Sequence, residues 1–431
     1  MALAIHLFFC TKKPNMTKTV YQHRGFAAFL SARVMAVLAT QIQAVVVAWQ
    51  VYDLTKDAMA LAWVGLAQFL PMLVLVLPAG DWVDRFHRKT ILACSWLVAL
   101  ACSVALWWLS GHGSAGVNGI YAVLLVYGCS RAFSGPAMQS LLPQIVPREQ
   151  LPQALATNSM LMRSAAIGGP LVGGFLYAQA GAAATFVVCA LCFAFGVLLL
   201  KQVVLFDPQA VKQAIAKARQ SSDSMLLRVK EGMHFIRHHP VVLGSISLDL
   251  FAVLLGGVVA LLPIYAQEVL HTDATGLGIL RSSMAVGEVA CGVYLSRKPF
   301  DQHIGRNLFI AVAVFGVANL VFAFSTWFWL SCAALLVAGM ADMVSVYVRS
   351  AMVQLSTPDA MRGRVNSVNM LFISSSNELG EFRAGTSAAA FGAVPAAVLG
   401  GACTLVVVGL WQKWFPALRQ ANTFKDVEKP D

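Results

Sequence analysis

Twelve long apolar stretches follow one another along this chain of 431 residues, and they limit what the chain can fold into. A helix needs about 20 mainly apolar residues to cross the hydrocarbon core of a bilayer. The stretches cover residues 25–52, 61–82, 90–110, 119–143, 152–178, 182–204, 241–267, 274–296, 307–325, 327–350, 361–384 and 389–411. The sequence therefore predicts an all-α membrane protein with twelve transmembrane helices.

The composition agrees with a bilayer as the solvent. Hydrophobic residues make up 58% of the chain and charged residues 12%, whereas soluble domains are nearer 45–50% apolar and about 25% charged. The net charge of +11 does not indicate a nucleic-acid partner. The basic residues lie in short clusters between apolar stretches, rather than in one patch with interleaved aromatic residues. We expect a lipid bilayer as a partner and no nucleic acid.

The two halves of the chain repeat each other. The segments 146–161 and 357–372 both enter a predicted helix through a proline, and the spacing from Pro147 to Asn158 equals that from Pro358 to Asn369. Such a duplication is typical of transporters whose two halves move about a binding site at the midplane. The expected parts are a cytoplasmic extension (1–24), two six-helix bundles (25–204 and 241–411), a cytoplasmic central loop (205–240) and a cytoplasmic tail (412–431).

Orientation follows from the basic residues near the helix ends, which gather on the cytoplasmic side of membrane proteins. With both termini in the cytoplasm, that side holds the basic residues of the central loop, the tail and most short loops, Arg349 included. The opposite side holds Lys56, with Arg383 near it. The asymmetry predicts that both termini are cytoplasmic.

Charged residues within the predicted spans are the most informative feature for function. A charge inside a bilayer costs about 2.5–3.5 kcal/mol on insertion scales and normally faces a bundle interior or a water-filled cavity. Four spans carry no charge in their interiors: 90–110, 182–204, 307–325 and 389–411. We expect these four to face lipid and the others to line a shared polar cavity.

The intramembrane charges fall into two candidate groups. A buried carboxylate that faces an arginine can bind and release a proton. The candidates for proton coupling are Asp249, Glu288, Asp342 and Glu378. The arginines that could hold an anionic substrate are Arg33, Arg131, Arg163 and Arg281. For both groups the alternative is a fixed salt bridge that holds helices together, and Glu381 with Arg383 is expected as a solvated pair at the outer surface.

Small residues mark one predicted helix. The string GGPLVGG places Gly169, Pro170, Gly173 and Gly174 in the span 152–178. Small residues allow helices to approach closely in a membrane, and the proline introduces a bend. Packing alone explains this string as well as a role in gating does.

The sequence predicts neither a cofactor nor a metal. It has no GxxxxGK[ST] string, the signature of a phosphate-binding loop. Glu231, His234 and His238 share a helical face with metal-like spacing. They lie in an amphipathic segment of the central loop, where a solvated face is the commoner reason for that spacing. We expect transport driven by an ion gradient rather than by ATP.

Several strings resemble those of the major facilitator superfamily. GDWVDRFHRK, residues 80–89, is similar to the signature of its loop between helices 2 and 3, with His87 where glycine is usual. GGPLVGG resembles the helix-5 motif of its drug/proton antiporters. FLSARV and TPDAMRGRVN resemble strings of bacterial siderophore exporters of the enterobactin type and of related efflux proteins. The resemblance extends from Arg24 to about Arg419.

The resemblance implies a fold, roles for residues and a function. The fold is two pseudo-repeated six-helix bundles, with Gly80 allowing the second helix to pack closely on the eleventh. The resemblance further implies that Asp84, Arg85, Arg88 and Lys89 form the contacts of a cytoplasmic gate. The implied activity is proton-coupled export of a small hydrophobic or amphipathic molecule, siderophore or drug-like, by a monomer in the bacterial cytoplasmic membrane. The alternatives are uptake or lipid flipping by the same fold, and a membrane-embedded enzyme. An enzyme needs a catalytic cluster at a helix end, which the sequence does not show.

Overall fold

The computed structural model describes residues 24–112, 116–147, 150–206, 209, 213, 216 and 225–424. Residues 1–23 of the predicted extension and 425–431 of the predicted tail lie outside this part. The long helices are α2 (Arg24–Thr55), α3 (Ala58–Arg85), α4 (Arg88–His112), α5 (Val117–Leu141), α6 (Leu151–Lys201), α9 (Pro240–Gly256), α11 (Ala274–Arg297), α12 (Ile304–Phe324), α13 (Phe328–Ser356), α14 (Asp359–Phe391) and α15 (Ala393–Trp414). The short elements are η2 (Leu142–Gln144), α8 (Met225–His238), η4 (Val259–Leu261), α10 (Leu262–Ile264), η5 (Tyr265–Val269) and α16 (Pro416–Gln420).

Within the described residues, twelve helical segments cross the bundle, and they confirm the predicted fold. α6 supplies two of them because it turns back at Gly181, whose φ of 75° is a conformation that glycine adopts readily. The seventh segment consists of α9 and the short pieces η4, α10 and η5. Eight helical stretches in the described residues are long and apolar enough to span a membrane, with α6 counted as one. α5, α11 and α14 complete the set.

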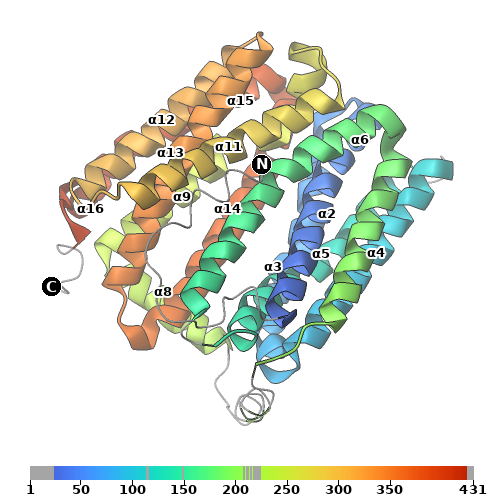
Figure 1. Ribbon diagram of the computed structural model, residues 1–431. Coiled ribbons are helices and arrows are strands. Elements are labelled where there is room, and N and C mark those ends of the chain that lie inside the picture. The colour runs from blue at the N-terminus through green and yellow to red at the C-terminus, as the bar shows by residue number, and fades with distance from the viewer. Residues whose placement is uncertain are drawn as a thin grey trace.

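The first six segments form one half of the molecule and the last six form the other. Figure 1 shows the blue-to-green half beside the yellow-to-red half. In the first half α6 packs on α2 and α4, and in the second half α11 packs on α13 and α12 on α15. The two halves meet chiefly where α3 lies against α14 and where α6 lies against α11. The short helix α8 packs on α14 and also touches α9 and α3.

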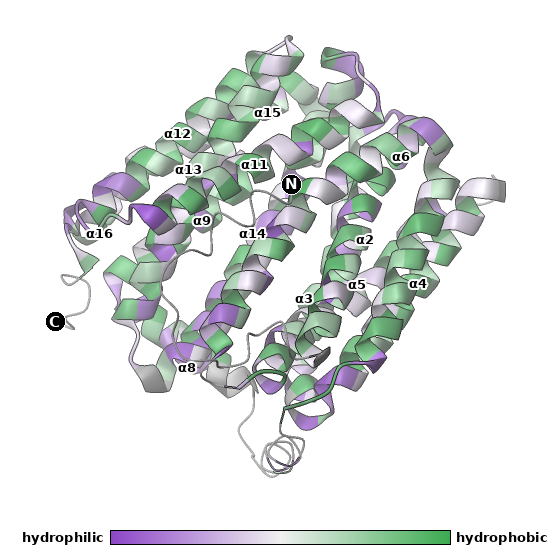
Figure 2. Cartoon of the chain, viewed as in Figure 1, coloured by the Kyte–Doolittle hydropathy of each residue, from purple (hydrophilic) through white to green (hydrophobic). Residues whose placement is uncertain are grey.

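Apolar side chains cover the outside of the bundle. In Figure 2 the long helices are mainly hydrophobic (green), and hydrophilic residues (purple) gather at helix ends and along α14. The four helical segments without interior charges expose large apolar side chains, among them Trp108, Phe195, Val317 and Val406. In water such a surface would be unfavourable, so it belongs against lipid.

One apolar core is shared by both halves. It joins Trp49 and Tyr52 of α2 to Leu261, Tyr265 and Ala384 of the second half. The other apolar cores each belong to a single half, except that one core of the second half also includes Ile236 of α8. The two halves are therefore sealed together mainly at the end of the bundle where this core lies.

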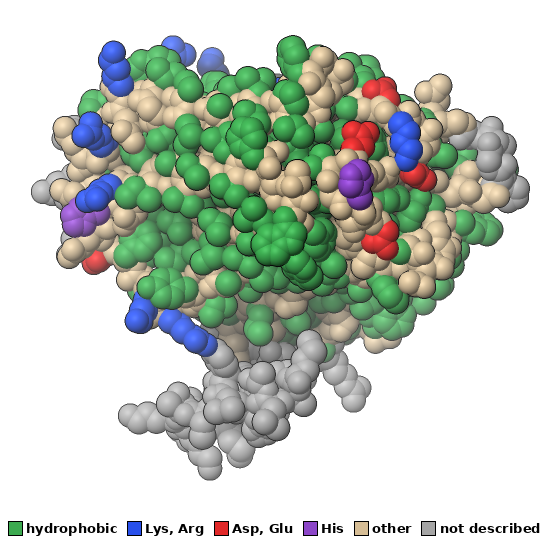
Figure 3. Space-filling model, turned by 90° about the horizontal axis from the view of Figure 1, so that it is seen from above, with side chains coloured by type: hydrophobic (Ala, Val, Ile, Leu, Met, Phe, Trp, Pro, Cys, Tyr) green, Lys and Arg blue, Asp and Glu red, His purple; other side chains and the backbone are tan. Residues whose placement is uncertain are grey.

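We call that end, which holds residues 53–58 and 257–273, the closed end, and the opposite end, which holds α8, the α8 end. Figure 3 looks down on the closed end, where the described side chains form a continuous and largely hydrophobic surface. Acidic side chains gather on one side of this face.

Candidate functional site

A cavity of about 400 Å³ lies between the two halves. Its wall is formed by α2, α3, α5 and the first arm of α6 from one half, and by η4, α10, α11 and α14 from the other. α4, the second arm of α6, α12 and α15 contribute no lining residue. Within the described part of the chain, the spans without interior charges therefore lie away from the cavity, as expected. The expectation that all the other spans line it does not hold for α13, which carries Asp342 but contributes no lining residue.

The wall combines apolar and polar side chains. Leu61, Val64, Val259, Leu262 and Met284 are among its apolar residues. The polar and charged residues are Thr40, Gln41, Gln43, Gln68, Tyr127, Arg131, Arg281, Glu288, Glu378 and Glu381. An amphipathic molecule could be held by both kinds of surface, because ligand sites are commonly apolar with a few placed polar groups.

Arg131 and Glu378 join the two halves across the cavity. Nη2 of Arg131 on α5 lies 2.9 Å from Oε1 of Glu378 on α14. Nη1 of Arg131 also donates a hydrogen bond of 3.3 Å to Gln68. Both members of the pair were candidates from the sequence, and the structure brings them together.

Arg163 and Glu288 form a second pair between the halves. Nη1 of Arg163 on α6 lies 3.4 Å from Oε2 of Glu288 on α11. Their side chains are 41% and 31% exposed, more than those of Arg131 and Glu378. Glu288 lines the cavity, whereas Arg163 is not one of its lining residues.

Arg281 and Glu381 line the cavity without an ion pair to any described residue. Nε of Arg281 is buried and has no hydrogen-bond acceptor in the described part of the chain. The expectation that Glu381 lies at the outer surface beside Arg383 is wrong. Glu381 follows Glu378 by three residues, so both lie on one face of α14, and that spacing could have placed Glu381 in the cavity.

Arg383 points to the other side of α14 and donates to main-chain carbonyls. Its Nε lies 3.1 Å from the oxygen of Leu254, and its Nη2 lies 3.3 Å from that of Gly257. A solvated pair is therefore the wrong description of this residue. The sequence could not show this contact, because a main-chain acceptor leaves no signal in the residue types.

Asp249 of α9 and Arg349 of α13 form an ion pair inside the second half. Their side chains are 8% and 5% exposed, and neither lines the cavity. From the sequence, Arg349 was counted only among the basic residues of the cytoplasmic side, and this buried pairing was not predicted. Asp342 of α13 interacts electrostatically with both members of this pair and with Glu288. Arg33 does not line the cavity, and its buried Nε has no hydrogen-bond partner among the described residues.

The glycines of the helix-5 string lie on two faces of α6. A Cβ on Gly169 would come within 2.5 Å of Gln41 on α2, in the same half. A Cβ on Gly174 would come within 2.3 Å of the Ala274 carbonyl on α11, in the other half, and a Cβ on Gly278 of α11 would come within 2.5 Å of the Pro170 carbonyl. Gly173 approaches α2 in the same way. The string thus lets α6 pack tightly on both helices.

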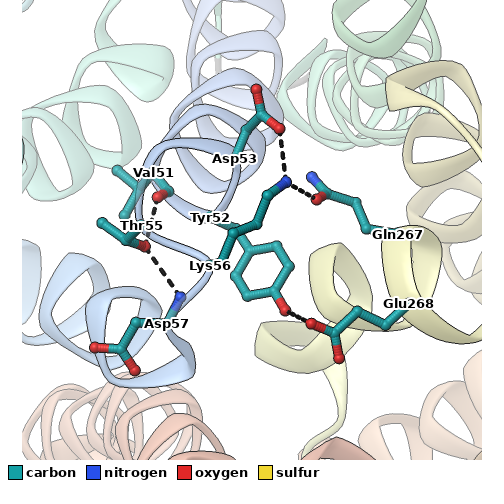
Figure 4. Close-up of polar contacts among 8 residues, drawn as sticks. All are labelled: Val51, Tyr52, Asp53, Thr55, Lys56, Asp57, Gln267 and Glu268. Atoms are coloured by element: carbon teal, nitrogen blue, oxygen red, sulfur yellow. Dashed lines mark hydrogen bonds and ion pairs between the residues drawn. The ribbon is translucent and has the colours of Figure 1, made fainter.

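A group of polar contacts between the halves lies at the closed end and is drawn in Figure 4; we call these contacts the latch. The hydroxyl of Tyr52 donates to Glu268. Nζ of Lys56 lies 2.8 Å from Asp53 and donates a hydrogen bond of 2.7 Å to Gln267. Tyr52 and Lys56 belong to the first half and Gln267 and Glu268 to the second, so these contacts close the cavity on this side.

The loop string at residues 80–89 shows contacts within its own half. Nε of Arg85 lies 2.9 Å from Asp81. Nζ of Lys89 donates to the carbonyls of Lys201 (3.0 Å) and Val203 (2.7 Å) at the end of α6. Gly80 is half-buried, and the side chain of Asp84 lies outside the described residues. The cytoplasmic gate contacts implied for Asp84, Arg85, Arg88 and Lys89 therefore stay a prediction.

Comparison with known proteins places this geometry in a family context. The family of transmembrane secretion effectors matches residues 18–428. The multidrug efflux pump Tap of Mycobacterium tuberculosis is 27% identical over 425 residues, which cover 93% of this chain and 96% of Tap. The enterobactin exporter EntS of Escherichia coli O1:K1 is 23% identical over 355 residues, 80% of this chain and 81% of EntS.

Solved structures share the fold. A bacterial homologue of the iron transporter ferroportin, in an inward-facing state, superposes with a TM-score of 0.68 at 16% identity, covering 92% of this chain and 99% of that one. A transporter of the POT family in complex with 5-aminolevulinic acid superposes with a TM-score of 0.72 at 11% identity, covering 92% and 96%.

Proposed function

The chain belongs to the transmembrane secretion effectors of the major facilitator superfamily, and from this premise we propose that it exports small amphipathic molecules in exchange for protons. The relatives Tap and EntS are named as exporters of drugs and of enterobactin. Their names support outward transport of a drug-like or siderophore-like molecule by this chain.

The observation that carries the proposal is a cavity that is crossed by ion pairs and sealed at one end. Arg131–Glu378 and Arg163–Glu288 each connect one half to the other. The latch and the shared apolar core close the same cavity at the closed end. Two halves joined in this way can alternate between access from one side and access from the other.

Membrane orientation is part of the proposal. The α8 end faces the cytoplasm of a bacterium, with both termini on that side, because the sequence places most of its loop lysines and arginines there. The protein acts as a monomer, since the cavity and both inter-half ion pairs are formed by one chain. The closed end then faces outwards, and the structure corresponds to a state closed to the outside.

Proton exchange is assigned to the cavity carboxylates. Glu378 and Glu288 are each held by an arginine of the opposite half, and Glu381 faces the cavity without such a partner. A protonated carboxyl group no longer attracts its arginine strongly, so proton binding favours separation of the halves. A cationic group or a hydrogen-bond donor on the substrate competes with the proton for the same carboxylates. Asp249 and Arg349 remain paired throughout the cycle.

Everted membrane vesicles test the proposal. Vesicles from cells that lack their own efflux pumps and express this chain should accumulate ethidium, an amphipathic cation, when respiration acidifies the lumen. A protonophore should abolish this accumulation, and vesicles with the Glu378→Gln variant should show little of it. Accumulation that persists with the protonophore present would contradict proton coupling. The same assay is repeated with an enterobactin-type siderophore as the probe. Accumulation of the siderophore but not of ethidium would indicate a narrow siderophore exporter, and accumulation of ethidium would indicate a drug exporter.

A further inference from the structure

The guanidinium of Arg383 lies at a break in the seventh helical segment. α9 ends at Gly256, and Gly257 has an extended backbone before η4 begins at Val259. The last carbonyls of a helix have no partner within the helix. Arg383 of α14 satisfies two carbonyls at this break, those of Leu254 and Gly257.

The break is held from two directions. From α14, Arg383 donates to it and Gly380 brings the backbone into contact, since a Cβ on Gly380 would come within 2.9 Å of the Val253 carbonyl. From α12, Nδ2 of Asn319 donates a hydrogen bond of 3.1 Å to the carbonyl of Gly256. α14 lines the cavity, whereas α12 contributes no residue to it. The two supports therefore differ in whether their helix reaches the cavity.

α14 carries cavity carboxylates on the face away from Arg383. An α-helix turns by about 100° per residue, so Arg383 lies about 200° around the helix from Glu381. Glu378 and Glu381 line the cavity, while Arg383 contacts α9. A displacement of α14 therefore acts on both faces at once.

Beyond the break, the chain leads to the latch. Val259 and Leu262 line the cavity, and Gln267 and Glu268 contact Lys56 and Tyr52 of the other half. The segment from Val259 to Val269 thus connects the break to the contacts that seal the closed end.

We propose that Arg383 is a positioning residue that transmits the charge state of Glu381 in the cavity to the latch at the closed end. While Glu381 is charged, it is repelled by Glu378 of its own helix and attracted by Arg281 of α11 and Arg131 of α5, so only the two attractions connect α14 to other helices. When Glu381 becomes neutral, its attraction to the two arginines is lost and α14 shifts. Arg383 then moves the break, and with it the segment from Val259 to Val269 that carries the latch contacts. The inference rests on the proposed alternating access.

A simpler role for Arg383 is to stabilise the end of α9. A cation at a helix C-terminus is favoured by the helix dipole and by the unpaired carbonyls. Asn319 also stabilises this break, but from a helix remote from the cavity. Asn319→Leu is therefore the matched control, because it weakens the break without disconnecting it from Glu381.

A double-mutant cycle with a distance readout tests the proposal. Spin labels are placed on cysteines at Leu54 and His271, which are exposed at the closed end on different halves and lie outside the latch contacts. The native cysteines are replaced, and the protein is measured in lipid nanodiscs. In the parent, Glu381→Gln should change the ratio of closed to open distances about fivefold or more, a typical size for coupling between sites.

In the Arg383→Met background the same Glu381→Gln change should shift the ratio by less than about twofold, well below the typical range of coupling. In the Asn319→Leu background the full shift should remain. If Arg383→Met does not fold, Arg383→Gln replaces it, and most of the shift should still be lost because one amide cannot bond both carbonyls. Three results would each overturn the inference. The shift could be unchanged without Arg383, it could be lost equally in the Asn319 and Arg383 backgrounds, or Glu381→Gln could cause no shift in the parent. The measurement needs neither substrate nor proton gradient, so a failure of ethidium export is distinguished from a failure of this coupling.

Discussion

Two ion pairs of the same chemistry differ in what they connect. Arg349 and Asp249 belong to one half and are almost fully buried away from the cavity. Arg131 and Glu378 belong to different halves, and both line the cavity. A pair within one half can persist while that half moves as a rigid body, whereas a pair between halves must break when they separate. Location, rather than residue type, decides which intramembrane charges can take part in transport.

The largest effect is expected from breaking the pair inside the second half. Asp249→Ala leaves the buried guanidinium of Arg349 without its partner, and such a loss costs about 3–5 kcal/mol. The expected result is a large fall in folded protein, measured as the yield of monodisperse protein in detergent and as its melting temperature.

The double variant Asp249→Leu with Arg349→Met separates a structural pair from a functional one. Replacing both charges of a buried pair by apolar residues is often neutral or stabilising. The double variant should recover folding and keep ethidium export. A well-folded double variant that has lost proton-driven export would place this pair in the transport cycle and remove the contrast between the two kinds of pair.

A large effect on transport with little effect on folding is expected for Glu378→Gln. The amide oxygen of glutamine can still accept a hydrogen bond from Arg131, but it cannot exchange a proton. Proton-driven ethidium export in vesicles should fall about tenfold, which corresponds to about 1.4 kcal/mol, with an unchanged melting temperature. Full export by this variant would show that the charge between the halves is dispensable.

The fold and the location of most cavity charges could be predicted from the sequence, because both follow from the distribution of apolar and charged residues. Arg131, Arg281, Glu288 and Glu378 were candidates and all line the cavity. Twelve apolar spans and the absence of interior charge in four of them determine which helices meet lipid.

The partners of the charges could not be predicted. A carboxylate on one helix can pair with arginines on several others, and one sequence does not say which helices are neighbours. Arg349 was therefore counted only among the basic residues of the cytoplasmic side, and its pairing with Asp249 between α13 and α9 was not predicted. Arg383 binds carbonyls exposed at a helix break, and the break itself has no clear signature beyond Gly256 and Gly257.

A smaller effect on transport is expected at the second pair between the halves. Arg163 and Glu288 lie 3.4 Å apart and are more exposed than Arg131 and Glu378. Partly solvated ion pairs contribute about 0–1 kcal/mol, so Glu288→Gln should lower proton-driven ethidium export by up to about fivefold. Measuring this variant beside Glu378→Gln in one vesicle preparation ranks the two pairs. A greater loss for Glu288→Gln would reverse the assignment of the principal coupling residue.

The smallest effect is expected at the exposed edge of the closed end. Lys56 contacts Asp53 within its own half and Gln267 across the halves, and the charged side chains are 58% and 52% exposed. Such contacts are weakened by solvent and by salt. Lys56→Met should therefore raise the open fraction of the Leu54–His271 spin-label distance by no more than about twofold at low salt, a change of about 0.4 kcal/mol. The difference should vanish at high salt. A large change that salt does not reduce would mean that Lys56, rather than the apolar core shared by the two halves, holds the closed end together.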